Sequence, residues 1–126
     1  MAHKNYPELY RSVAGRLGRI AEDIPEPFDG FRKLHVSSVA DGALSTKHKE
    51  LIALAIGLAV RCDGCIAFHV HDALKAGATR EEILETLGVV ILMGGGPSAV
   101  YAGEALEALD QFEAEERDRA SPAAAG

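Results

Sequence analysis

The chain has 126 residues, the length of one compact domain, because domains cluster at roughly 100 to 150 residues. Hydrophobic residues make up 48% of it and charged residues 25%, a composition typical of a folded protein and not of a disordered one. The 13 lysines and arginines are outnumbered by 19 acidic residues, so the net charge is -6 and no basic cluster is left to neutralise phosphates. We therefore expect no nucleic-acid partner.

The longest stretch without a charged residue covers residues 86–103, close to the roughly 20 residues that a membrane span needs. Three glycines and Pro97 interrupt it in the middle, which argues against a span. Residues 1–11 carry charges and lack the apolar core of a secretory signal. We expect a cytoplasmic protein without a membrane partner. In that compartment two cysteines indicate redox or metal chemistry more often than a structural disulfide.

The first third of the chain has the spacing of two amphipathic helices. Over residues 6–21 apolar side chains recur near every fourth position and form one stripe, made of Leu9, Val13, Leu17 and Ile20. The proline-containing segment 23–27 predicts a break. Helical spacing resumes over residues 28–39, and the Asp-Gly pair at 41–42 marks the expected end of the second helix.

The next helix is predicted over residues 47–61. Either Ser45 or Thr46 can cap it by accepting a hydrogen bond from a free backbone N–H of the first turn. Its middle, residues 51–60, is apolar on every side. A helix without a polar face has to be enclosed by other helices or by another subunit, and a chain this small can hardly enclose it alone. This helix therefore predicts an oligomer.

Three more helices are predicted, over residues 66–76, about 80–93 and 97–119. The Asp-Gly pair at 63–64 indicates a tight turn or a helix restart before the first of them, and Gly77 ends it. Thr79 and Glu82 form a Thr-x-x-Glu capping box before the second. Pro97 suits the first turn of the last helix.

These signals predict an all-α fold, a single-domain bundle of about six helices over residues 1–120. Alternating strand patterns are nearly absent, and no repeat of 20 to 50 residues occurs. The last six residues, 121–126, are expected to form a disordered tail.

Cys62, Cys65 and His69 stand at positions i, i+3 and i+7, which share one face of a helix. His69 lies one turn beyond Cys65, within reach of its sulfur. Free cysteine has a pKa of about 8.5, and a neighbouring imidazolium or a helix N-terminus lowers it by a unit or more. The segment therefore predicts a reactive thiol with a base beside it.

Glu50 lies twelve positions before Cys62, about 18 Å away along a straight helix. If the chain reverses at Asp63 and Gly64, His69 has travelled roughly 10 Å back along the preceding helix, towards Glu50. The two side chains can then meet across the hairpin. A carboxylate in that place orients the imidazole and favours its charged form.

The arrangement of Glu50, Cys62-x-x-Cys65 and His69 resembles the signature of the alkylhydroperoxidase D-like branch of the carboxymuconolactone decarboxylase family. The surrounding Lys-Glu-Leu-Ile-Ala-Leu-Ala-Ile and the later Gly-Gly-Gly-Pro-Ser-Ala-Val-Tyr are similar to small single-domain members. The likeness covers roughly residues 28–112. Its Glu/Cys/Cys/His spacing is far more specific than a CxxC pair alone.

The resemblance implies an all-helical oligomer, a homotrimer or homohexamer, without a prosthetic group. It implies that Cys65 attacks a peroxide, Cys62 resolves the sulfenic acid, and His69 with Glu50 relays the proton. Peroxide or another disulfide is then the oxidising substrate, and a thiol protein or a lipoyl-type dithiol is the electron donor. The helix dipole argues for the other order, because it favours the cysteine that starts the following helix, Cys62.

The chain departs from the family pattern at Gly64. The alkylhydroperoxidase has a second histidine immediately before its second cysteine, and Gly64 stands in that place. The departure weighs against the peroxidase reaction, although disulfide chemistry needs only the two thiols.

Other interpretations of the cysteine pair remain open. Free cysteines often pack as small apolar residues. Cys62, Cys65 and His69, with His71 or His48 as a fourth ligand, can form a zinc site, which would make the chain a metal-binding or assembly module. A lactone decarboxylase-like or isomerase-like enzyme would use Glu50 or His69 as acid or base, with the cysteines incidental. The remaining histidines are expected to face solvent or to pack without a chemical role: His3, His35, His48 and His71.

Overall fold

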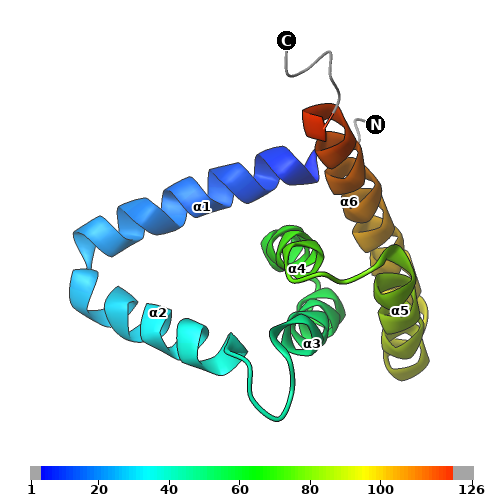
Figure 1. Cartoon of the computed structure of the whole chain (residues 1–126), viewed down its shortest axis with the longest axis horizontal. Helices are drawn as coiled ribbons and strands as arrows, with labels where there is room; N and C mark the ends of the chain where they lie inside the picture. Colours follow the sequence, from blue (N-terminus) through cyan, green and yellow to red (C-terminus); the bar gives the residue numbers. More distant parts are fainter. Residues whose placement is uncertain (1–3, 121–126) are drawn as a thin grey trace.

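The computed structural model describes residues 4–120, which form six α-helices in succession (Figure 1). Their bounds are α1 Tyr6–Asp23, α2 Pro25–Val39, α3 Thr46–Ala59, α4 Asp63–Lys75, α5 Arg80–Gly94 and α6 Gly96–Ala120. The described residues contain no strand. The predicted all-α fold of about six helices is therefore confirmed. The predicted tail at 121–126 lies outside the described residues.

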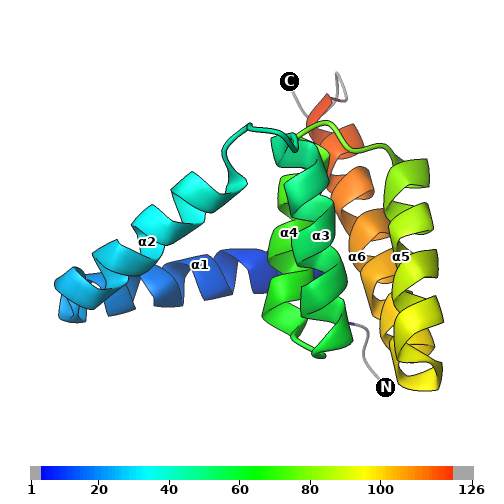
Figure 2. The same cartoon turned by 90° about the horizontal axis from the view of Figure 1, so that it is seen from below.

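Helices α3 to α6 run alongside one another, and α1 and α2 project from them as a V-shaped pair (Figure 2). We call α1 and α2 the arm. The buried core lies among α3–α6 and includes Tyr6 at the start of the arm. Its largest fully buried side chains are Tyr6, Leu54, Leu58, Ile66, Val70, Ile83 and Leu109. The arm contributes few buried residues, since α2 has none.

The break predicted at residues 23–27 is much shorter in the structure. Only Ile24 separates α1 from α2, and α2 begins at Pro25. Proline fits the first position of a helix, because its missing N–H would have no partner there and its φ angle is already helical. The proline that ends one helix pattern thus begins the next helix.

The α3–α4 hairpin reverses slightly earlier than the sequence predicted. Asp63 and Gly64 lie inside the first turn of α4, and the reversal falls at Val60, Arg61 and Cys62. Arg61 has a φ of 61°, the left-handed conformation that commonly ends a helix, although it is not a glycine. The prediction of a helix restart at this pair was right, and that of a tight turn at the same place was wrong.

The two helices of this hairpin approach each other closely at Gly57. A Cβ atom added to Gly57 would lie 2.7 Å from the Cβ of Cys65. The absence of a side chain at Gly57 therefore allows α3 to pack directly against the first turns of α4.

Predicted caps explain where α3 and α5 begin. Ser45 caps α3, with its side chain accepting from the backbone N–H of His48. Thr79 and Glu82 form both bonds of the capping box at α5. Pro97 lies in the first turn of α6, as predicted.

Several apolar side chains remain on the surface of the chain. One stripe with a spacing of four residues runs along α3 to its C-cap residue and is made of Ile52, Ile56 and Val60. Leu92 and Met93 near the end of α5 are about four-fifths exposed, at 79% and 81%. Helices α4 to α6 and the arm thus enclose only part of the apolar helix α3. None of the described helices combines the length and the apolar character that a membrane span requires.

Candidate functional site

Glu50 and His69 meet across the α3–α4 hairpin. His69 Nδ1 lies 2.8 Å from Glu50 Oε1, a hydrogen-bonding distance. Glu50 is only 3% exposed, on the side of α3 that faces α4. A buried carboxylate is costly unless a polar partner compensates it, and His69 is such a partner. Because Nδ1 faces the carboxylate, the other ring nitrogen, Nε2, remains available on the opposite side of the imidazole.

Cys62 and Cys65 form a disulfide at the beginning of α4. Cys62 is the N-cap residue of this helix, and its sulfur accepts a hydrogen bond from the backbone N–H of Cys65 at 3.2 Å. Cys65 lies one turn before His69 on the same helix. The structure thus shows the oxidised form of the pair, with both sulfurs beside the helix N-terminus.

A pocket of about 440 Å³ brings these groups together. It lies between the arm and α4, and both cysteines and His69 line it. Its other walls are largely apolar and come from Val13, Leu17, Phe28, Phe31 and Phe68. The pocket can therefore admit a partly apolar molecule to the disulfide and the imidazole.

Gly64 lines the same pocket. A Cβ at this position would meet only the side chain of Val13, at an ordinary contact distance of 3.6 Å. The residue that replaces the family's second histidine thus leaves space and no polar group at this part of the wall.

Two histidines without an expected role have different surroundings. His71 packs as expected: its Nδ1 lies 2.8 Å from Asp72 Oδ1, and its ring stacks on Tyr10 with centroids 4.1 Å apart. His35 on α2 instead lines the pocket with the disulfide and His69. His35 is exposed, in agreement with the expected solvent-facing role, but the sequence did not indicate that it lines this pocket. His3 lies outside the described residues.

The CxxC pattern suggested a metal site at the two cysteines. In the structure, the side chains whose metal-ligating atoms lie close together are different ones. Among residues 4–120, possible ligand atoms of His35, Glu50 and Asp72 all lie within 4.8 Å of one another. The two cysteine sulfurs are bonded to each other and are not free to bind a metal in this form.

An ion cluster ties the beginning of the chain to the CxxC turn. Lys4 donates to Asp63, which stands between the two cysteines, at 2.7 Å and to Glu104 of α6 at 2.5 Å. These two carboxylates hold the pKa of Lys4 above its usual range. Next to them, burial and the charge of Glu104 raise the pKa of Tyr6. Through Lys4, which precedes α1, the first turn of α4 is thereby linked to α6.

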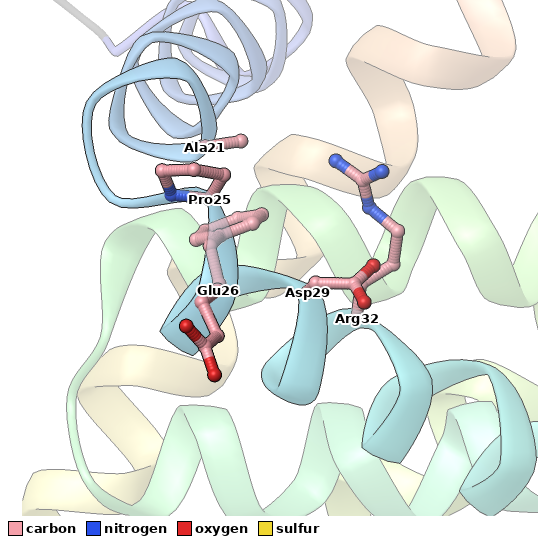
Figure 3. Close-up of a pocket in the computed structure, with 6 residues that line it drawn as sticks. Ala21, Pro25, Glu26, Asp29 and Arg32 are labelled. Atoms are coloured by element: carbon pink, nitrogen blue, oxygen red, sulfur yellow. The ribbon is translucent and has the colours of Figure 1, made fainter.

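A second pocket, of about 400 Å³, opens at the bend of the arm (Figure 3). Ala21 and Pro25 line one side, and the charged side chains of Glu26 and Arg32 point in different directions. Phe28 and Arg32 line both this pocket and the one at the disulfide. The bend therefore adjoins the candidate site but contains no cysteine or histidine of its own.

The fold and the site together define an all-helical protein with a CxxC disulfide hairpin and a buried Glu–His pair. The family model for the carboxymuconolactone decarboxylase family matches residues 24–108. The chain belongs to this family.

Solved structures support the assignment. One is the crystal structure of a carboxymuconolactone decarboxylase family protein from Legionella pneumophila, whose sequence is 46% identical to this chain. The match covers 85% of this chain and 96% of the Legionella chain, with a TM-score of 0.82. Another member, from Thermotoga maritima, is described as possibly involved in antioxidative response. Its sequence is 25% identical to this chain, and the match covers 89% of this chain and 96% of the Thermotoga chain, with a TM-score of 0.80.

Curated relatives connect the chain to alkylhydroperoxidase D more distantly. An uncharacterised protein of Cupriavidus necator is 38% identical over 79% of this chain and 88% of its own length. The alkyl hydroperoxide reductase AhpD of Mycobacterium marinum is 28% identical over 65% of this chain. The match covers 47% of that enzyme, so the chain corresponds to about half of it.

Proposed function

We propose that the protein is a thiol-dependent peroxidase or disulfide oxidoreductase that acts through Cys62 and Cys65. The observation that carries the proposal is that both the CxxC disulfide and His69 line one pocket. The Nδ1 atom of the same His69 is hydrogen-bonded to buried Glu50. The names of the relatives support it, since the AhpD relatives are named alkyl hydroperoxide reductases and the Thermotoga protein is described as possibly involved in antioxidative response.

The reaction begins from the dithiol. The Cys65 thiolate attacks one oxygen of a hydroperoxide, the O–O bond breaks, and Cys65 becomes a sulfenic acid while an alcohol leaves. The Cys62 thiol then displaces water from that sulfenic acid, which gives the disulfide seen in the structure. A donor dithiol reduces the disulfide with two electrons and two protons and becomes a disulfide itself.

His69 and Glu50 serve as the proton relay in this cycle. The free face of the imidazole takes the proton of the Cys65 thiol and delivers it to the departing alkoxide. Glu50 orients the ring and compensates the positive charge that forms on it. The donor in this proposal is a thiol protein or a lipoyl-type dithiol, and a disulfide can replace the peroxide as oxidant.

The test is to reduce the protein, titrate its free thiols before and after one equivalent of an organic hydroperoxide, and measure the mass. We expect two thiols and two hydrogens to be lost per chain. The control is the Cys62→Ser, Cys65→Ser double variant, which should consume no peroxide. Peroxide consumption by the double variant would assign the chemistry to other residues, and an unreacted dithiol in the wild type would refute the peroxidase.

A further inference from the structure

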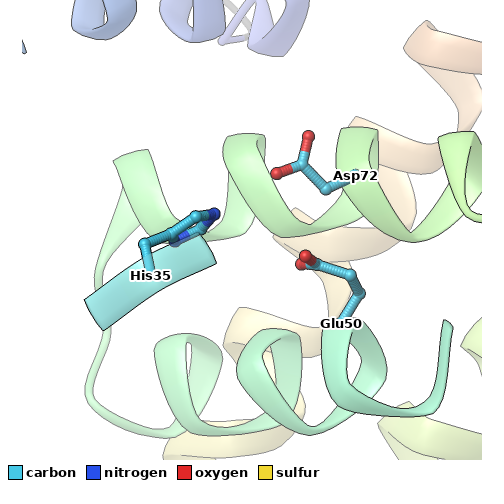
Figure 4. Close-up of side chains that lie close together, drawn as sticks. All are labelled: His35, Glu50 and Asp72. Atoms are coloured by element: carbon cyan, nitrogen blue, oxygen red, sulfur yellow. The ribbon is translucent and has the colours of Figure 1, made fainter. Parts of the chain in front are cut away.

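His35, Glu50 and Asp72 come from three different helices and point towards one another (Figure 4). His35 lies on α2 of the arm, Glu50 on α3 and Asp72 on α4. One ring nitrogen of His35 and one oxygen of each carboxylate lie within 4.8 Å of one another. The buried Glu50–His69 pair therefore has a second imidazole close to its carboxylate side.

The separation suits proton transfer. Two hydrogen bonds of about 2.8 Å that meet at one water molecule span a gap of this size, and a small side-chain rotation closes it directly. Glu50 is almost completely buried, whereas His35 is exposed. His35 is therefore placed to connect the enclosed carboxylate with solvent or with a molecule in the pocket.

His35 also lies in the same pocket as the disulfide. Together with His69, it is one of the two histidines that line this pocket in the described chain. Gly64, between the cysteines, contributes no side chain that can carry a proton. Any imidazole besides His69 must therefore come from outside the CxxC turn, and α2 supplies it.

The groups around His35 provide acceptors for its proton. Glu50 faces it from α3, and Asp72 and His69 line the pocket from α4. Arg32 of its own helix also lines the pocket, whereas the residues of α1 there, Val13 and Leu17, are apolar. An imidazole beside two carboxylates can pass a proton to either of them.

We propose that His35 is a second proton-transfer residue of this site, carrying protons between the substrate side of the pocket and the Glu50–His69 pair. The inference rests on the proposed thiol–disulfide function. When a donor dithiol opens the Cys62–Cys65 disulfide, its two S–H protons must reach the two cysteine sulfurs. His35 takes a proton from the donor thiol, and Glu50 and His69 pass one to the sulfur that leaves.

The experiment compares His35→Gln and His35→Ala with the matched control His48→Ala. His48 is also exposed, lies on α3, and does not line the pocket. Two reactions are timed in the presence of a chelator: oxidation of the reduced protein by an organic hydroperoxide, and reduction of the disulfide by a small dithiol. General acid–base groups contribute about 100-fold or more, and because His69 remains we expect a loss of about tenfold in both His35 variants.

Added imidazole distinguishes proton transfer from a structural effect. We expect it to restore part of the rate in His35→Ala, where it can occupy the vacated space, and to leave the wild type and His48→Ala unchanged. Unchanged rates in both His35 variants, a full rate in His35→Gln, or a loss that imidazole does not rescue would each overturn the proposal. Melting temperatures of all variants identify any loss that comes from unfolding.

The two reactions also separate this inference from the proposed function. If the wild-type dithiol does not react with peroxide, the peroxidase proposal fails. The reduction of the disulfide by dithiol still tests His35, because that step moves protons through the same pocket.

Discussion

Glu50 lies where a charged side chain is rarely found without a partner, at 3% exposure and 2.8 Å from His69. This contact allows one experiment to separate chemistry from packing. Glu50→Gln keeps a hydrogen-bonding group of the same shape but removes the charge, and His69→Ala removes the imidazole.

We expect both variants to oxidise more slowly than the wild type, by about tenfold or more for His69→Ala, because both groups move or stabilise the thiol proton. In His69→Ala the apparent pKa of the reactive thiol should rise, because the charged imidazole that favours the thiolate is gone. The rate of thiol alkylation measured against pH checks this. Glu81→Gln, an exposed carboxylate at the start of α5, is the matched control. An unchanged pH profile would remove His69 from the site.

The order of attack is a second prediction about single residues. We expect Cys62→Ser still to form a trappable sulfenic acid on Cys65 when challenged with peroxide, and Cys65→Ser to form none. His69 is one turn from Cys65 and acts on its proton directly, whereas the helix dipole stabilises a thiolate at half-buried Cys62 by at most about 2 kcal/mol and takes up no proton. Mass spectrometry after trapping gives the position. A sulfenic acid on Cys62 alone would reverse the two roles.

Spacing in the sequence predicted the contact between Glu50 and His69 because both residues belong to one hairpin, where helix geometry fixes the distance. It gave no indication of His35. That residue reaches the pocket only because the arm turns at Ile24 and carries α2 back towards α4, and this turn depends on packing between distant segments. The sequence shows only that His35 lies one turn beyond Phe31 on the same helix face, and the structure is needed to show that this face lines the pocket.

At the scale of helices, the packing of α3 on α4 depends on Gly57. We expect Gly57→Ala to lower the free energy of unfolding by about 1–3 kcal/mol, the usual cost of overpacking, because the new methyl group meets the Cβ of Cys65. Denaturant unfolding measures the change.

Gly18 provides the control for this prediction. It lies within α1, and a Cβ there meets nothing within 4 Å. Alanine favours a helix over glycine by about 1 kcal/mol, so Gly18→Ala should be neutral or stabilising. If Gly57→Ala is also neutral, the close approach of α3 and α4 does not limit stability.

Local signals predicted the beginnings of α3 and α5 closely, because a cap is a contact between residues three positions apart, whereas α2 and α4 each begin three residues before their predicted start. The capping box at Thr79 and Glu82 needed no knowledge of the rest of the chain. The end of α3 was harder to predict. The chain reverses at Arg61, which has the left-handed conformation that sequence rules assign to glycine or asparagine. The sequence therefore predicts the reversal a little later, at the Asp-Gly pair.

For the whole molecule, the exposed stripe of Ile52, Ile56 and Val60 remains to be explained. We expect the chain to assemble into a trimer or a hexamer that covers apolar surface of this kind. Light scattering at micromolar concentration should give the mass of the oligomer. Ile56→Glu should lower that mass, because a carboxylate in an apolar interface loses its hydration.

Asp118→Lys near the end of α6 is the corresponding control, since it changes a charge at an exposed position far from the stripe in sequence. It should leave the mass unchanged. A monomeric wild type would contradict the expectation of an oligomer, and an Ile56→Glu variant with the mass of the wild type would place the interface elsewhere.

The capping role of Cys62 has a consequence for the direction of disulfide opening. Its sulfur accepts the Cys65 N–H at the positive end of α4, a place that stabilises a thiolate more than a thiol. A stabilised thiolate is the better leaving group in thiol–disulfide exchange. The incoming donor should therefore form its mixed disulfide with Cys65 and release Cys62, so the sulfur that meets the oxidant also meets the reductant.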